Sequence, residues 1–377
     1  MSIRIDCEFP GGNIIVDRIE EHEVYLRQDL RDTEGPWFYW YFRVRDTGEQ
    51  ELTFYFTDGD VIGTQGPAVS TDGGWSWSWL GRSCVNESSF SYSFTADMPE
   101  VRFSFAMPYT EEHLHAFLGS YDANPHIKKE TLCLSRKGRE VEQLFLGKPD
   151  TNPQYKLIFT SRHHCCEMMA DYAVQGIIEE ILSGSETGEW FLENTEVCIV
   201  PFVDKDGVED GDQGKKRRPR DHGRDYKGKN IYTETAAIQK FLPGWAEDTP
   251  LVALDIHCPW IRGDHNEDIY FVGGQNKENW KKVLEFSKVL ESVCKESLPY
   301  NSENNLPFGE LWNKPDNFTQ GRGFKTWNET IPGVILSSAM EIPYATAGGE
   351  EVNASSAQAF GRDLAKAFAQ YLSKRNR

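Results

Sequence analysis

Apolar and polar positions alternate with a period of two through much of the first hundred residues. In "SFSYSF" (89–94) small serines separate the aromatic residues, the pattern of a strand with one buried face. Comparable aromatic runs, bounded by Asp-Gly or Gly-Gly turns, cover 37–46, 51–60, 73–81 and 101–108. Several short strands of this kind predict an antiparallel β-sandwich, which we assign to residues 1–108.

After residue 108 the pattern changes to apolar strands that alternate with amphipathic helices. Such alternation predicts an α/β domain over residues 109–377, with a mixed, mostly parallel central sheet flanked by helices. A short helix over 111–121 would join the two domains. Further strands are expected at 156–161, 196–203, 251–258, 268–274 and 333–343, helices at 168–183, 276–297 and 355–373, and a long polar loop at 207–230.

Composition narrows the class of protein. The chain has 377 residues and is 39% apolar, enough for two cores. Its net charge of -19 disfavours nucleic acid and anionic membranes as partners. We find neither a run of about 18 uncharged apolar residues nor a signal-peptide pattern, so we expect a cytoplasmic protein with no membrane partner. The eight cysteines form no C-x-x-C pair and are expected to be free thiols.

Two potential metal ligands stand where an apolar strand gives way to a helix, in "SRHHCCE" (161–167). His164 and Glu167 are three residues apart, so both can face one cation once the chain becomes helical. A helix cap beside a solvated charge is the alternative for this pair. His163 is expected to point away from such a cation.

Two more strands end on residues that could act with this pair. His257 ends "LVALDIH", and Asp255, two residues earlier, would lie on the same face. Two histidines and one glutamate form the ligand set of catalytic zinc, which keeps a fourth position for water. Glu341 ends "GVILSSAME" and could accept a proton from that water.

A basic cluster from Lys215 to Arg224 interrupts the otherwise acidic chain. A solvated loop or a nuclear-localisation signal is one interpretation. The other is that some of these guanidinium groups face the cleft and bind a carboxylate or a developing oxyanion.

Taken together and in order, these segments resemble the zinc carboxypeptidase family, the carboxypeptidase A-like funnelins. "SRHHCCE", "VPFVDKDGV", "RRPRDHGRDY", "LDIHCPW" and "SAMEIPY" resemble the family's ligand, loop, arginine, second-histidine and catalytic-glutamate elements. A β-rich region followed by "MPYTEEHL" is similar to the cytosolic carboxypeptidase branch. The resemblance implies a carboxypeptidase-like fold for the second domain and one Zn²⁺ per chain.

The resemblance also implies a role for each matching residue. The zinc ligands would be His164, Glu167 and His257, and the general base Glu341. Arg217 would stabilise the oxyanion, and the substrate carboxylate would be held by Arg224 beside Gly223, which stands where the family has asparagine.

The function implied is that of a zinc metallocarboxypeptidase, which hydrolyses a C-terminal peptide or isopeptide bond with a metal-activated water. Its partner would be the C-terminus of a peptide or protein. Two alternatives stay open: a non-catalytic zinc- or peptide-binding module, and an amidase or deacylase on the same scaffold.

Overall fold

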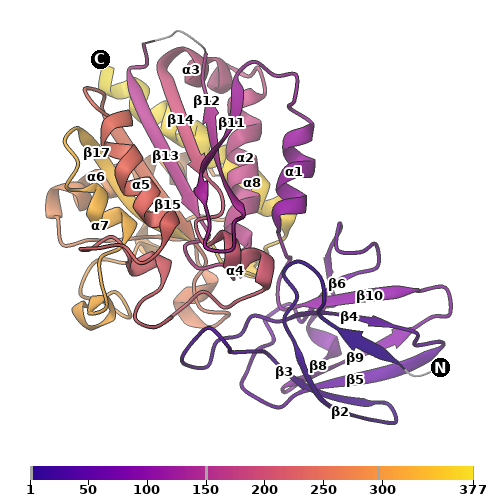
Figure 1. The fold of residues 1–377 in the computed structure, drawn as a ribbon. Coiled ribbons are helices and arrows are strands. Elements are labelled where there is room, and N and C mark those ends of the chain that lie inside the picture. Colours follow the sequence, from indigo (N-terminus) through magenta and orange to yellow (C-terminus); the bar gives the residue numbers. More distant parts are fainter. Residues whose placement is uncertain (1–2, 149–151, 295–297, 377) are drawn as a thin grey trace.

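The computed structural model describes residues 3–148, 152–294 and 298–376, which form two parts that follow each other along the chain (Figure 1). The first part, residues 3–108, contains two five-stranded sheets, with strand orders β1-β4-β10-β6-β7 and β2-β3-β5-β9-β8. The strands are β1 (Arg4–Asp6), β2 (Ile15–Glu20), β3 (Glu23–Arg27), β4 (Tyr41–Arg45), β5 (Gln50–Phe56), β6 (Ala68–Ser70), β7 (Ser78–Trp79), β8 (Val85–Asn86), β9 (Ser89–Phe94) and β10 (Glu100–Ser104).

Strand pairing in these two sheets is antiparallel with one exception. β3 and β5 are parallel, so the expectation of purely antiparallel pairing is wrong there. The physical reason is the connection, because the chain passes through β4 of the other sheet before it returns as β5. Aromatic rings join the two sheets: the centroid of Phe54 in β5 lies 5.5 Å from that of Phe42 in β4 and 5.4 Å from that of Phe103 in β10.

The second part is built on a seven-stranded mixed sheet of order β11-β12-β14-β13-β15-β17-β16. β14, β13, β15 and β17 are parallel to one another, and the strands outside this block pair antiparallel. The strands are β11 (Ile127–Leu134), β12 (Glu140–Leu146), β13 (Tyr155–Ser161), β14 (Thr195–Val200), β15 (Leu251–His257), β16 (Tyr270–Val272) and β17 (Val334–Glu341), followed by a hairpin of β18 (Thr346–Ala347) and β19 (Glu350–Glu351).

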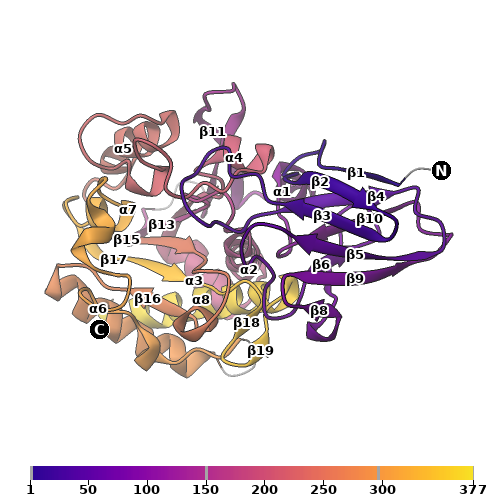
Figure 2. The ribbon, with the colours of Figure 1, turned by 90° about the horizontal axis from the view of Figure 1, so that it is seen from below.

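Helices cover both faces of this sheet (Figures 1 and 2). They are α1 (Glu111–Gly119), α2 (Met169–Leu182), α3 (Glu186–Asn194), α4 (Lys205–Asp210), α5 (Thr233–Trp245), α6 (Lys277–Val293), α7 (Phe324–Asn328) and α8 (Ala354–Ser373). Leu157 and Phe159 of β13 share a core with α2, α6 and α8, whereas Ile158 between them packs with α5 and α7. The apolar run of β13 therefore follows from burial on both faces.

Some elements differ from those expected. The β11–β12 hairpin and the helices α3 and α5 were not predicted, and the expected loop 207–230 begins within α4 and contains the 3₁₀ turn His222–Arg224. The expected helix over 276–297 is α6, and residues 295–297 lie outside the described ranges. Within those ranges, no helix has the length and apolar character needed to cross a membrane.

Candidate metal centre and active site

The predicted ligands meet at the carboxyl ends of three parallel strands. His257 ends β15 and pairs in register with Glu341, the last residue of β17. β13, on the other side of β15, leads into the turn that carries His164 and Glu167. Ligand atoms of His164, Glu167 and His257 lie within 4.8 Å of one another.

The two histidines present the same ring nitrogen to the shared carboxylate. Nδ1 of His164 lies 2.9 Å from Glu167 Oε1, and Nδ1 of His257 lies 2.7 Å from Glu167 Oε2. Their opposite nitrogens face aspartates: His257 Nε2 is 2.7 Å from Asp255 Oδ2, and His164 Nε2 is 3.8 Å from Asp221 Oδ1. A carboxylate that accepts the proton of Nε2 leaves the lone pair of Nδ1 for a metal. This donor set fits zinc.

Behind His257 lies a buried hydrogen-bonded chain that was not foreseen. His163 was expected to point away from the cation, and its ring is fully buried. Its Nδ1 lies 2.7 Å from Asp255 Oδ1 and its Nε2 lies 2.7 Å from the Tyr226 hydroxyl. Burial lowers the pKa of His163, which favours its neutral form. Asp255 thus bridges His163 and His257.

Glu341 is buried beside the ligands and is poorly satisfied. Its Oε2 has no hydrogen-bond partner among the described residues. Burial raises the pKa of Glu341 to about 7. A carboxyl group with such a pKa can take up and release a proton near neutral pH.

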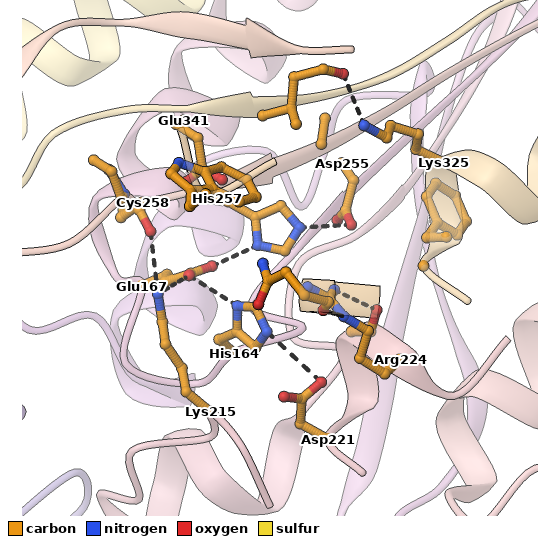
Figure 3. Close-up of a pocket in the computed structure, with 18 of the residues that line it drawn as sticks. His164, Glu167, Lys215, Asp221, Arg224, Asp255, His257, Cys258, Lys325 and Glu341 are labelled. Carbon is orange, nitrogen blue, oxygen red and sulfur yellow. Dashed lines mark hydrogen bonds and ion pairs between the residues drawn. The ribbon is translucent and has the colours of Figure 1, made fainter. Parts of the chain in front are cut away.

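A cavity of about 440 Å³ opens over these residues. Its lining includes the metal-ligand candidates, Glu341 and a set of cationic and aromatic side chains, namely Lys215, Lys216, Arg224, Lys325, Trp37, Trp260, Trp312, Phe318 and Phe324. Figure 3 shows His164, Glu167 and His257 grouped together, with Lys215 and Arg224 on opposite sides of His164.

Arg224 and Gly223, for which the family resemblance implies a role in binding the substrate carboxylate, both line this cavity. The Arg224 guanidinium lies 4.8 Å from the centre of the Phe318 ring and donates to the Asn317 and Gly223 carbonyls. A Cβ atom at position 223 would lie 2.9 Å from His164 Nε2. The glycine therefore makes room for a candidate ligand.

Arg217 does not line the cavity, although a substrate-facing position was expected. Its guanidinium is bound by the carboxylates of Asp32, Asp204 and Asp212 at 2.5–2.9 Å. Three carboxylates satisfy a planar guanidinium from several sides and hold it in place. Lys215, two residues earlier, faces the cavity instead, with Nζ 2.6 Å from Glu167 Oε1.

Lys325 is a third lysine that lines the cavity, and its environment is unusual. Its ammonium is buried and donates to the carbonyls of Val272 and Gly273, both at 2.8 Å. Burial lowers the pKa of Lys325 to about 7. The sequence offered no signal for this burial, since Lys325 lies in the short helix α7 that was not expected.

Burial disfavours the thiolate form of the cysteines beside the candidate ligands. Cys165, Cys166 and Cys258 are buried, and burial raises the pKa of each thiol, that of Cys166 to about 12. Among the described residues, these three cysteines form no disulfide.

Two other groups of potential metal ligands occur among the described residues. One consists of His163, Asp255 and His257, and its hydrogen bonds are described above. The other consists of Glu111, His115 and Glu142. There the Lys205 ammonium lies 2.8 Å from Glu111 and 2.7 Å from Glu142 and neutralises the two carboxylates. The Lys205 ammonium thus takes the place that a metal cation would have between these two carboxylates.

Two histidines, a glutamate and an unsatisfied second glutamate over a cavity form a candidate site of a zinc hydrolase. Residues 114–258 match the family described as "Zinc carboxypeptidase". The resemblance seen in the sequence is thus confirmed: this segment is similar to a zinc carboxypeptidase domain.

Relatives in the curated proteins include cytosolic carboxypeptidase 2 of Xenopus tropicalis, 25% identical over 265 residues, which are 60% of this chain and 27% of that protein. Cytosolic carboxypeptidase 6 of Caenorhabditis elegans is 24% identical over 229 residues, 54% of this chain and 50% of that protein. The chain therefore spans between about a quarter and half of the length of these relatives.

Solved structures match nearly the whole chain. A metallo-carboxypeptidase from Burkholderia cenocepacia has a TM-score of 0.79 at 18% identity, covering 99% of this chain and 100% of that one. A metallo-carboxypeptidase from Pseudomonas aeruginosa in complex with (2-guanidinoethylmercapto)succinic acid has a TM-score of 0.74 at 19% identity, covering 99% of each chain. The carboxypeptidase-like fold is thus confirmed, and the relatives and neighbours are hydrolases of peptide bonds.

Proposed function

We propose that this chain is a zinc-dependent metallocarboxypeptidase that hydrolyses a C-terminal peptide or isopeptide bond. The observation that carries the proposal is the meeting of His164, Glu167 and His257 with Glu341 at the cavity that Arg224 also lines. Among the described residues, Oε2 of Glu341 has no hydrogen-bond partner. Ligands, base and carboxylate anchor are the groups that this reaction requires.

His164, Glu167 and His257 would hold one Zn²⁺, which supplies Lewis acidity that polarises a carbonyl and lowers the pKa of a water. Glu341 takes the proton from the attacking water and passes it to the leaving amine. Its pKa of about 7 suits both transfers. Arg224 binds the terminal carboxylate of the substrate, with Gly223 beside it.

The contacts of Arg217 support a positioning role for this residue. One of its carboxylate partners, Asp32, belongs to the first part of the chain, and the other two, Asp204 and Asp212, belong to the second. Arg217 therefore helps to hold the two parts together. Lys215, which faces the cavity next to Glu167, is better placed to meet negative charge that develops on the substrate.

For the molecule as a whole, we propose two domains, 1–108 and 109–377, the first being a β-sandwich. The aromatic contacts between its two sheets support this arrangement. We also propose a cytoplasmic location, as the names of the relatives suggest, with peptide or protein C-termini as partners and no nucleic acid.

The decisive experiment combines metal removal with replacement of the base. Chelation should abolish hydrolysis of peptides with a free C-terminus, and added zinc should restore it. Glu341→Gln should keep zinc and lower kcat about 10²- to 10⁴-fold, the usual contribution of a general base. Glu350→Gln, at an exposed glutamate of β19, is the matched control and should leave kcat unchanged.

The outcomes separate the alternatives. If the parent protein binds zinc and peptides but cleaves no peptide, it is a binding module. Equal cleavage of peptides with amidated C-termini would indicate an amidase. Full activity of Glu341→Gln would refute the assigned base.

A further inference from the structure

One stretch of the first part, residues 28–40 between β3 and β4, reaches the cavity of the second part. Trp37 in this stretch lines the cavity, together with Trp260 from the loop that follows β15. The two ring centroids are 5.1 Å apart, with an interplanar angle of 54°. Trp260 is 37% exposed although it is apolar, so the wall that the pair forms is accessible.

The stretch is held in place by a dense set of contacts to residues 210–218. The Asp32 carboxylate accepts hydrogen bonds from the backbone N–H groups of Gln213 at 3.0 Å and Gly214 at 2.9 Å, besides its ion pair with Arg217. The Thr33 hydroxyl donates to the carbonyl of Lys215. The position of Trp37 at the cavity is therefore fixed by the fold.

The position of this wall relative to the site follows from Lys215. Its ammonium lies 5.1 Å from the centre of the Trp37 ring and 2.6 Å from Glu167. In Figure 3, Arg224 is on the other side of His164. A peptide whose terminal carboxylate is bound by Arg224 would thus pass the ligands and continue toward Trp37.

We propose that Trp37 and Trp260 form a subsite for the residue that precedes the scissile bond, and that this subsite prefers an apolar or aromatic side chain. Indole rings offer large apolar faces at low conformational cost, and stacked or tilted aromatic contacts are favourable. The direction of the peptide rests on the proposed function. The first part of the chain would then supply a substrate-binding residue.

Peptide binding to the slowly hydrolysing Glu341→Gln variant, measured by calorimetry with zinc present, tests this subsite. The probes are two N-acetylated dipeptides with the same C-terminal residue and either phenylalanine or glycine before it. Trp37→Ala should weaken binding of the phenylalanine peptide about tenfold and leave the glycine peptide nearly unchanged, as expected for a lost apolar contact. Trp37→Phe should restore most of the affinity.

Trp75→Ala is the matched control, because Trp75 is a 50% exposed tryptophan of the first part that does not line the cavity. It should change neither affinity. Trp260→Ala, in the second part, should reproduce the selective loss, so the test does not depend on the folding of one variant. Zinc content and unfolding temperature are measured for each variant.

Three results would overturn the subsite. Trp37→Ala could weaken the binding of both peptides equally, it could weaken neither, or the Glu341→Gln protein with Trp37 intact could bind neither peptide. If the parent hydrolyses peptides and Trp37→Ala changes neither affinity, the proposed function holds and the subsite is refuted. Binding without hydrolysis, with the selective loss intact, would support an apolar subsite for the residue before the C-terminal one and refute the peptidase.

Discussion

At the scale of single residues, Gly223 shows how the site constrains the sequence. The family resemblance leads one to expect asparagine there, yet a Cβ at this position would lie 2.9 Å from His164 Nε2. That distance is shorter than van der Waals contact, so the ring of a candidate ligand would have to move.

Gly223→Ala should therefore weaken zinc binding, by about 10- to 100-fold if displacement of the ring resembles loss of a supporting hydrogen bond. Competition with a chromophoric chelator measures the zinc affinity of the apo protein and needs no substrate. An unfolding temperature close to that of the parent would show that the effect is local. An unchanged zinc affinity would mean that the ring adapts.

The sequence carried enough information for the candidate ligands and less for their surroundings. His164 and Glu167 could be found because their spacing has a meaning at a helix start, and His257 because it ends an apolar strand. The burial of His163 depends on Tyr226, 63 residues away, which no local pattern reveals. Arg217 and Lys215 lie in a segment without periodicity, so their opposite orientations could not be derived.

At the scale of elements, predictability followed the contrast between apolar and polar positions. β13, β15 and β17 are buried on both faces and were recognised as apolar runs. β11 is an edge strand with mostly exposed residues, in the sequence "IKKETLCL", and resembles a polar loop. In α5 an internal proline and mixed composition hid the helix.

The packing of α2 against α8 depends on glycines at the contact. A Cβ at Gly361 of α8 would lie 2.0 Å from the backbone carbonyl oxygen of Ala173 in α2. Gly361→Ala should therefore destabilise the protein by about 3 kcal/mol, the upper end for overpacking, because backbone must move.

Thermal unfolding measures this effect, and Gly244→Ala in α5 provides the control. A Cβ at Gly244 meets nothing within 4 Å, and alanine is the better helix former, so this variant should be equal to the parent or slightly more stable. Equal stability of the two alanine variants would show that α2 and α8 can separate at low cost.

At the scale of the whole molecule, the two parts share an apolar core. Phe38 and Phe105 of the first part pack on Tyr344 of the second, with ring centroids 5.6 and 4.9 Å apart. The order of the parts could be predicted from the change of pattern near residue 108. Their interface could not, because it joins irregular segments whose contacts are long-range.

Residues 109–377 expressed alone should consequently fail to reach the stability of the whole chain, since apolar surface around Tyr344 would be exposed. Unfolding temperature and binding of a hydrophobic dye compare the fragment with the whole chain. A fragment that unfolds cooperatively at the temperature of the parent and binds zinc equally well would contradict this expectation.

The contacts of residues 28–40 with 210–218 also bear on how this architecture could be recombined. Asp32 bonds to the backbone of the segment that leads to Lys215, and Arg31 forms an ion pair with Asp212 at 2.8 Å. A graft of another β-rich part onto the second part of this chain would lack the matching charges. The two segments would have to be transplanted together, so the natural unit of exchange is this pair and not the first part by itself.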